Sequence, residues 1–337
     1  MPLSEMSFQT GMNMLGIKSS YAVKRNTNSN CFFIFLFFTI FPSILFSQKR
    51  QDSIIEIGNN YITLSNVIID HNLNVPSFIN KVKSDTSFYK AFKNLRILGY
   101  TAINDIRMLD HRNQKLQASL HSKTKQQIIA HCRTMQTLEE AVTGDFYEEY
   151  KSYNYYTAQL YASLFFTKDS VCNETNIVGN EQFSTIDKSG IEKHKEQLKM
   201  LFFNPGKRIG GIPFMSGKTA IFDNDVAENY DMSIDADIYN HTNCIVFKQK
   251  VKQGKESNVV VDEMTTWFDD STYDVMARNY TLSFDAGFYD FKVTMEVKMT
   301  KYKTLIVPEL IRYNGNWKAI FKKRERGVFT ATLFDFE

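Results

Sequence analysis

The stretch YDFKVTMEVKM, residues 289–299, decides the fold class, because apolar and polar side chains alternate along its whole length. Its odd-numbered residues are apolar, and its even-numbered residues are charged or carry a hydroxyl. This period of two is typical of a β-strand with one face toward a core and the other toward water. The stretch YDMSIDADI, residues 230–238, repeats the pattern with its even-numbered positions apolar. Together the two runs predict a half-buried sheet.

Further strand signals surround these two runs. Residues 243–247, 263–268 and 328–336 are short apolar or aromatic segments with strand character. The pair Asn314-Gly315 predicts a tight hairpin turn between residues 310–311 and 317–321, because both residue types tolerate the positive φ of a type I′ turn. Successive strands joined by short turns predict an antiparallel sheet with one wet face. We therefore expect an α+β fold with a large curved antiparallel sheet.

The chain before residue 170 mixes helix and strand patterns. Residues 75–92 place apolar side chains three, four or seven apart, which predicts an amphipathic helix that begins near Pro76-Ser77. Residues 98–108 and 116–120 alternate as strands, with His111-Arg112-Asn113 as the turn between them. From residue 126 to 166 the spacing predicts helix again. We expect these helices to cover one face of the sheet.

Composition limits the classes of function. An apolar share of 43% supports a substantial core, and the 28 Phe and 17 Tyr favour strands or aromatic-lined surfaces. Lys and Arg total 40 against 37 Asp and Glu, so no excess of positive charge favours nucleic acid as a partner. With 6 Pro and 15 Gly, the sequence offers no long flexible linker. We expect a single domain over residues 48–337.

The N-terminal region predicts export. Residues 32–46, FFIFLFFTIFPSILF, follow Lys24-Arg25 and end just before Ser47. A basic segment, an apolar run and a small residue are typical of a secretory signal peptide, which we expect to be cleaved after Ser47. The leader before Lys24 is long, so the start codon stays open. The alternative is an uncleaved anchor, but the run is shorter than the roughly 20 residues that span a bilayer. The predicted location is the periplasm or the periplasmic face of the outer membrane.

Cleavage leaves three cysteines, Cys132, Cys172 and Cys244, in the mature chain. Their spacing matches neither a zinc site nor a disulfide framework, although one bridge could form and leave one thiol over. Cys244 begins the strand-like sequence CIVF, which predicts a buried cysteine. No redox chemistry is assigned.

Three motifs that suggest chemistry are better explained otherwise. Gly217-Lys218-Thr219 lacks the glycine that a phosphate-binding loop needs at position 212. The aspartates of residues 231–237 fit the solvated face of a strand rather than a calcium loop. His111, His121 and His131 match no metal-ligand pattern. These observations predict a protein without a catalytic site, metal or other cofactor.

A basic cluster near the C-terminus leaves two interpretations open. It could contact anionic lipid head groups, or it could be the charged end of a hairpin. Its members are Lys318, Lys322, Lys323, Arg324 and Arg326.

The order of signal, helix, strand hairpin, helix and long antiparallel meander resembles the LolA/LolB-like lipoprotein carriers. The stretch DTSFYKAFKNL, residues 85–95, and the block 230–284 carry most of the resemblance. It implies a half-open barrel with helices plugging its concave side. It also implies a non-catalytic carrier that holds lipoprotein acyl chains or another hydrophobic ligand in an apolar cavity.

The candidate cavity-lining residues come from the two alternating strands. They are Tyr230, Met232, Ile234, Ile238, Tyr289, Phe291, Val293, Met295, Val297 and Met299. Methionine suits such a site because its side chain adapts to varied apolar ligands. The same residues would equally form a filled core. In that alternative the chain is a structural or interaction protein of the cell envelope, with an outer-membrane protein as its partner.

Overall fold

The computed structural model describes residues 52–57, 60–70, 73–178, 199–209, 215, 217–287, 290–318 and 323–337. The predicted signal at residues 1–47 lies outside the described residues, as do Tyr289 and Lys322.

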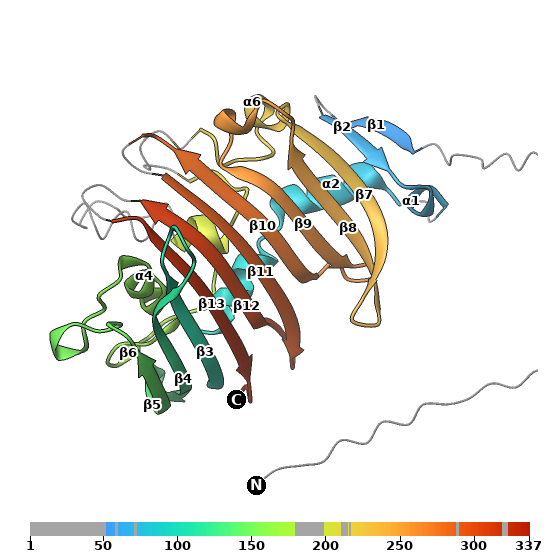
Figure 1. The fold of residues 1–337 in the computed structure, drawn as a ribbon. Coiled ribbons are helices and arrows are strands. Elements are labelled where there is room, and N and C mark those ends of the chain that lie inside the picture. Colours follow the sequence, from blue (N-terminus) through green and yellow to red (C-terminus); the bar gives the residue numbers. More distant parts are fainter. Residues whose placement is uncertain are drawn as a thin grey trace, which may run out of the picture. The chain divides into compact units, whose positions relative to one another are not determined.

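Thirteen strands form one open sheet in this part of the chain (Figure 1). In spatial order they are β1 (Ser53–Ile57), β2 (Asn60–Leu64), β7 (Tyr230–Tyr239), β8 (Thr242–Val251), β9 (Val261–Asp269), β10 (Val275–Asp285), β11 (Asp290–Tyr302), β12 (Leu305–Lys318), β13 (Glu325–Phe334), β3 (Tyr100–Leu109), β4 (Leu116–Ile129), β5 (Cys132–Thr143) and β6 (Val171–Cys172). All neighbours pair antiparallel except β2 and β7, which are parallel. The predicted fold class is confirmed.

The pairing of β13 with β3 joins distant parts of the sequence inside the sheet. Its register runs from Arg326 opposite Leu109 to Phe334 opposite Thr101. The ladder continues beyond the strands, because Gly99 and Glu337 exchange two backbone hydrogen bonds of 3.0 and 2.9 Å. The C-terminal strand is therefore an interior strand of the sheet.

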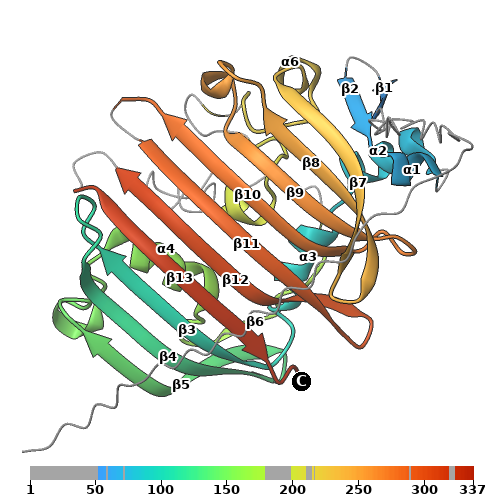
Figure 2. The ribbon, with the colours of Figure 1, turned by 45° about the vertical axis from the view of Figure 1, so that its right-hand side comes forward.

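Helices cover one face of the sheet, which we call the helix-covered face. They are α2 (Val75–Ser84), α3 (Ser87–Asn94), α4 (Tyr156–Phe165) and the helical residues 199–203. Figure 2 looks onto the opposite face, with α3 and α4 behind the strands. The short helices α1 (Asn66–Asp70) and α6 (Asn224–Ala227) and the 3₁₀ turns η1 (Glu149–Lys151) and η2 (Glu256–Asn258) lie in the connections.

Aromatic side chains attach these helices to the strands. Phe78 of α2 meets the Phe268 ring of β9 edge to face at 5.4 Å. Phe202 lies 6.0 Å from the Trp317 ring of β12, and Tyr161 of α4 lies 4.6 Å from the Phe329 ring of β13. Such ring pairs add to the apolar burial that drives packing. The high aromatic content therefore serves the layer between helices and sheet.

The single helix predicted over residues 75–92 is wrong, because the chain breaks at Asp85-Thr86 into α2 and α3. Asp85 has extended backbone, and its carboxylate accepts a 2.9 Å hydrogen bond from Ser87 N–H at the start of α3. The same carboxylate lies 3.8 Å from the buried Arg278 guanidinium of β10. A helical residue 85 would not combine these contacts.

The helix predicted over residues 126–166 is also wrong for residues 126–155. The predicted α-helix begins only with α4 at Tyr156. Strand β4 continues to Ile129, and the turn at Ala130-His131 has positive φ at both residues. Gln126 is buried there, and its amide donates to the carbonyls of Leu95 and Leu98. Almost every residue of β5 is at least partly exposed, so that strand has no alternating pattern to reveal it.

The hairpin predicted at Asn314-Gly315 is wrong, because Gly315 lies inside β12 and pairs with Val293 and Gly327 on its two sides. The Tyr313 side chain lies over this glycine, and a Cβ at position 315 would come within 1.9 Å of the tyrosine oxygen. The glycine marks the close approach of a side chain. The β11–β12 turn is instead at Lys303, whose φ is positive.

The cysteines divide into a bridge and a buried thiol. Cys132 of β5 and Cys172 of β6 form a disulfide. Cys244 of β8 is buried and free, as the sequence predicts. The disulfide anchors the segment after α4 to the sheet edge.

Candidate functional site

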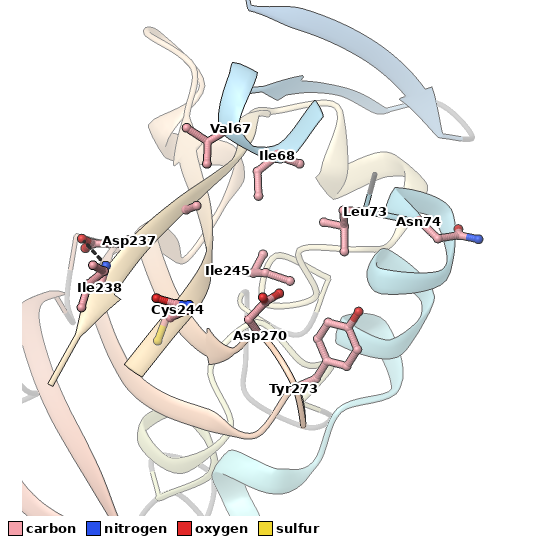
Figure 3. A pocket seen from close by; sticks show the side chains of 12 residues that line it. Val67, Ile68, Leu73, Asn74, Asp237, Ile238, Cys244, Ile245, Asp270 and Tyr273 are labelled. Carbon is pink, nitrogen blue, oxygen red and sulfur yellow. Dashed lines mark hydrogen bonds between the residues drawn. The ribbon is translucent and has the colours of Figure 1, made fainter. Parts of the chain in front are cut away.

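A pocket with a volume of about 570 Å³ lies where β7 and β8 meet α1 and α2 (Figure 3). Pockets of roughly 300–1,000 Å³ are the usual size for small-molecule ligands. Its apolar lining comes from separate segments of the chain. The lining includes Val67, Ile68, Leu73, Ala236, Ile238 and Ile245.

The β7–β8 hairpin forms the floor and one lip of the pocket. Asn240 and His241 have positive φ at the tip, as a tight hairpin requires. The register places Ala236 opposite Ile245. Ile245 is 2% exposed and closes the floor, whereas Ile238 is 70% exposed at the lip. The hairpin thus presents a graded apolar surface from the interior to the mouth.

Helix α1 forms the opposite wall. Ile68 is 3% exposed and faces the interior, while Val67 is 42% exposed at the mouth. The backbone N–H of Ser65, just before α1, donates a 3.0 Å hydrogen bond to the Ile234 carbonyl of β7. This bond continues the parallel β2–β7 ladder and fixes the distance between wall and floor.

The turn between β9 and β10 contributes Tyr273 and is fixed to α2. The Asp269 carboxylate accepts hydrogen bonds from Ser271 and Thr272, and the Ser271 hydroxyl is the main cause that lowers the Asp269 pKa. The Lys81 ammonium lies 4.4 Å from the centre of the Tyr273 ring and donates to the Thr272 carbonyl. These contacts hold the tyrosine side of the pocket in place before any ligand binds.

The polar part of the lining contains Asp237, Asp270, Asn243 and Cys244. The Asp237 carboxylate accepts from Ile238 N–H at 2.8 Å and from the Trp267 indole N–H at 3.1 Å. The Cys244 thiol donates to the Thr242 carbonyl, and burial raises its pKa. Figure 3 shows the Asp270 side chain beside Ile245. Asp237 and Cys244 alternate with Ala236 and Ile245 and so lie on the opposite face of the strands, which leaves Asp270 as the acidic side chain beside the apolar floor in the described lining.

The helix-covered face itself is tightly packed under α4. The gap bounded there by Tyr161, Phe202 and Met295 has a volume of about 10 Å³, which is too small for a ligand. A further hollow of about 390 Å³ at the other end of the strands is lined by charged residues, including Lys218, Lys292 and Arg324. Arg324 there bonds to Asp290 and Asn316.

The predicted lining residues lie mainly in the packed layer. The buried members are Tyr230, Met232, Ile234, Phe291, Val293, Met295, Val297 and Met299. Of the described candidates, Ile238 lines the 570 Å³ pocket, Met295 borders the small gap and Phe291 borders the charged hollow. That these residues together line one ligand cavity stays a prediction.

Sequence reasoning missed most of the pocket. Val67, Ile68, Ile245 and Tyr273 come from an α1 helix of five residues, a strand and a turn, and they share no motif. The one local signal was the acidic turn DDSTYD, residues 269–274. It precedes a strand, and its first aspartate organises the turn that positions Tyr273.

The structure gives the motif around Gly217-Lys218-Thr219 a packing role. The Thr219 hydroxyl is buried and accepts from Ile209 N–H, and Lys218 donates to the Ser257 carbonyl. Across the described ranges, no group of three or more His, Cys, Asp or Glu side chains is arranged to hold a metal ion. No helix in those ranges has the length and apolarity needed to cross a membrane.

No family model matches the sequence, and no curated protein matches it. A Vibrio parahaemolyticus domain named for outer membrane lipoprotein sorting is 10% identical over 74% of this chain and 91% of its own, with a TM-score of 0.24. A DUF1329 family protein from Desulfovibrio piger is 10% identical over 75% and 93%, with a TM-score of 0.22. The first name agrees with the resemblance predicted from the sequence.

Proposed function

We propose that this chain is a non-catalytic binding protein of the bacterial cell envelope. A signal peptide over residues 1–47 would direct its single domain, residues 48–337, to the periplasm or the periplasmic face of the outer membrane. The ligand is a hydrophobic molecule of the acyl-chain class, as in a lipoprotein carrier. It binds in the pocket between α1, α2 and the β7–β8 hairpin.

The observation that carries the proposal is the apolar part of the pocket's lining, beside a filled layer under α4. Ile68, Ala236 and Ile245 form a concave surface within a volume of about 570 Å³. Transfer of a hydrocarbon chain from water onto such a surface is favourable by about 0.8 kcal/mol for each buried CH₂ group. The packed layer under α4 leaves about 10 Å³, so a ligand there would have to displace the helices.

The disulfide supports the proposed location. A bridge between Cys132 and Cys172 fits an oxidising compartment, where disulfides form and persist. The cytosol keeps thiols reduced. The disulfide therefore supports export independently of the apolar run at residues 32–46.

Binding of a neutral hydrophobic fluorophore tests the function. N-phenyl-1-naphthylamine should bind the purified protein at about one molecule per chain and gain fluorescence. Ala236→Trp fills the pocket from the strand side and should weaken this binding at least about tenfold. Ile103→Trp, at an exposed position on β3, is the matched control and should bind like the parent protein. Equal binding by both variants, or none by the parent, would overturn the proposal.

A second candidate function rests on the filled layer and on the edge of β5. In it the chain is a structural or interaction protein that engages an outer-membrane protein. Among the described residues, β6 covers the outer edge of β5 only at Cys132 and Arg133. Backbone groups along the rest of such an edge can pair with a strand of another protein.

Two measurements on the protein from cells separate these functions. Mass spectrometry of the extracted protein should find a bound lipid at stoichiometric amount if it is a carrier. Cross-linking that recovers one dominant envelope protein, from a chain free of lipid, would favour the interaction function instead.

A further inference from the structure

We propose that the pocket selects amphiphiles with a cationic head group over those with an anionic one. This inference deepens the proposed function and rests on it, because it names the ligand class for the same pocket. The alkyl chain lies on the apolar floor, and the head group lies near Asp270.

The charges of the lining carry the inference. The Asp270 carboxylate lies beside Ile245 on the pocket side, and the described lining contains no Lys, Arg or His (Figure 3). Unlike charges attract more strongly beside an apolar wall than in bulk water, because the effective dielectric constant is lower. A cationic head is therefore favoured, and an anionic head would be repelled by Asp270.

The Asp270 carboxylate is not neutralised by a described cation. Asp270 donates its backbone N–H to the Asn243 carbonyl, which holds the residue at the pocket without using its carboxylate. No ion pair joins Asp270 to a lysine or arginine of the described chain.

The nearest ammonium group on α2 is already engaged. Lys81 lies over the Tyr273 ring at 4.4 Å and donates to the Thr272 carbonyl. These contacts direct it to the turn. Lys81 is not part of the pocket lining.

Among the described residues, the N-terminus of α2 could attract an anion to the pocket, but its donors are reduced. Helix N-termini bind anions through N–H groups of the first turn. Here Pro76 has no N–H, and the N–H of Ser77 donates to the Asn74 side chain at 3.0 Å. Among the first three helical positions, only Val75 keeps an N–H for a ligand.

Three probes with the same twelve-carbon chain test the inference. Dodecyltrimethylammonium, dodecanoate and neutral dodecyl maltoside are titrated below their micelle concentrations against protein loaded with N-phenyl-1-naphthylamine. We expect the ammonium probe to displace the fluorophore at a concentration at least about fivefold lower than dodecanoate, as for one partly exposed ion pair. Added salt should narrow this difference and leave the maltoside unaffected.

Charge variants assign the effect to the pocket. Asp270→Asn should weaken binding of the ammonium probe about fivefold and have little effect on binding of the maltoside. Asp270→Lys should make dodecanoate bind more tightly than the ammonium probe. Asp274→Asn removes the same charge from the same turn, at a residue outside the lining, and should change the preference less than twofold.

The outcomes separate the two proposals. If dodecanoate displaces the fluorophore as well as the ammonium probe does, the inference is overturned and the proposed function stands. Weaker binding of all three probes to the Asp270→Asn variant, with an unchanged circular dichroism spectrum, would likewise overturn the inference. If the fluorophore itself fails to bind the parent protein, the proposed function fails first.

Discussion

The Glu325 carboxylate accepts hydrogen bonds from both the backbone N–H and the hydroxyl of Thr157, at 2.8 and 2.5 Å. Its other oxygen accepts from Tyr156 N–H at 3.0 Å. Helix α4 has no side-chain cap of its own at Tyr155, so β13 supplies the cap from 168 residues away. A negative charge at this position also favours the positive end of the helix dipole.

Removal of this cap should destabilise the protein. We expect Glu325→Ala to lower the free energy of unfolding by about 1–3 kcal/mol, because three donors lose their charged acceptor. Urea titration monitored by circular dichroism measures the change. Glu263→Ala, at an exposed position on β9, should stay within about 0.5 kcal/mol of the parent. Equal stability of the two variants would contradict the capping role.

Gly315 should not tolerate a methyl group. Gly315→Ala places a Cβ within 1.9 Å of the Tyr313 hydroxyl oxygen, so the ring must move out of the packed layer. We expect a loss of about 1–3 kcal/mol in the free energy of unfolding. Gly217→Ala is the matched control, since nothing lies within 4 Å of its added Cβ. A loss as large at position 217 would show that the effect does not come from the tyrosine.

Reduction of the disulfide should weaken the edge of the sheet. The bridge closes a loop with a sequence separation of 40, and its loss should lower the free energy of unfolding by about 2–4 kcal/mol. The readout is the urea midpoint with and without reductant. In the Cys132→Ala, Cys172→Ala double variant, reductant should have no further effect. A shift there would point to Cys244.

Stability should fall above about pH 10. Burial raises the pKa of Tyr100 to about 12 and also raises the pKa values of Tyr161, Tyr280 and Tyr313. Below the unfolded pKa of about 10 their full contribution is present. As pH rises further, the unfolded chain loses phenol protons that the folded chain keeps. Each tyrosine then costs about 1.4 kcal/mol per pH unit. Urea midpoints from about pH 8 to 11 measure the slope, and a flat profile would refute the prediction.

The sequence predicts the strands whose two faces differ. Residues 230–238 and 289–299 alternate cleanly because one side meets the helices and the other meets water, and β7 and β11 follow them closely. Strand β5 was not predicted, because it is exposed on both faces and its sequence therefore does not alternate. The break at Asp85 depends on Arg278, which lies far away in the sequence.

The pocket could not be predicted in the same way. Its walls depend on the approach of Val67, Ala236 and Tyr273, which is set by the order of strands rather than by a local pattern. Ile238 shows the limit of alternation. It continues the apolar parity of β7 but lies at the exposed lip, because the hairpin extends past the layer that the helices cover.

The pairing of β13 with β3 also governs when the molecule can assemble. The paired residues are separated by roughly 220 positions, so this ladder closes one of the longest loops the chain allows. During translation, the edge of β3 that pairs with β13 stays unpaired until β13 has left the ribosome. The ladder between β13 and β3 can therefore form only after residues 325–334 have been synthesised, and its edge of β3 is open to other partners until then.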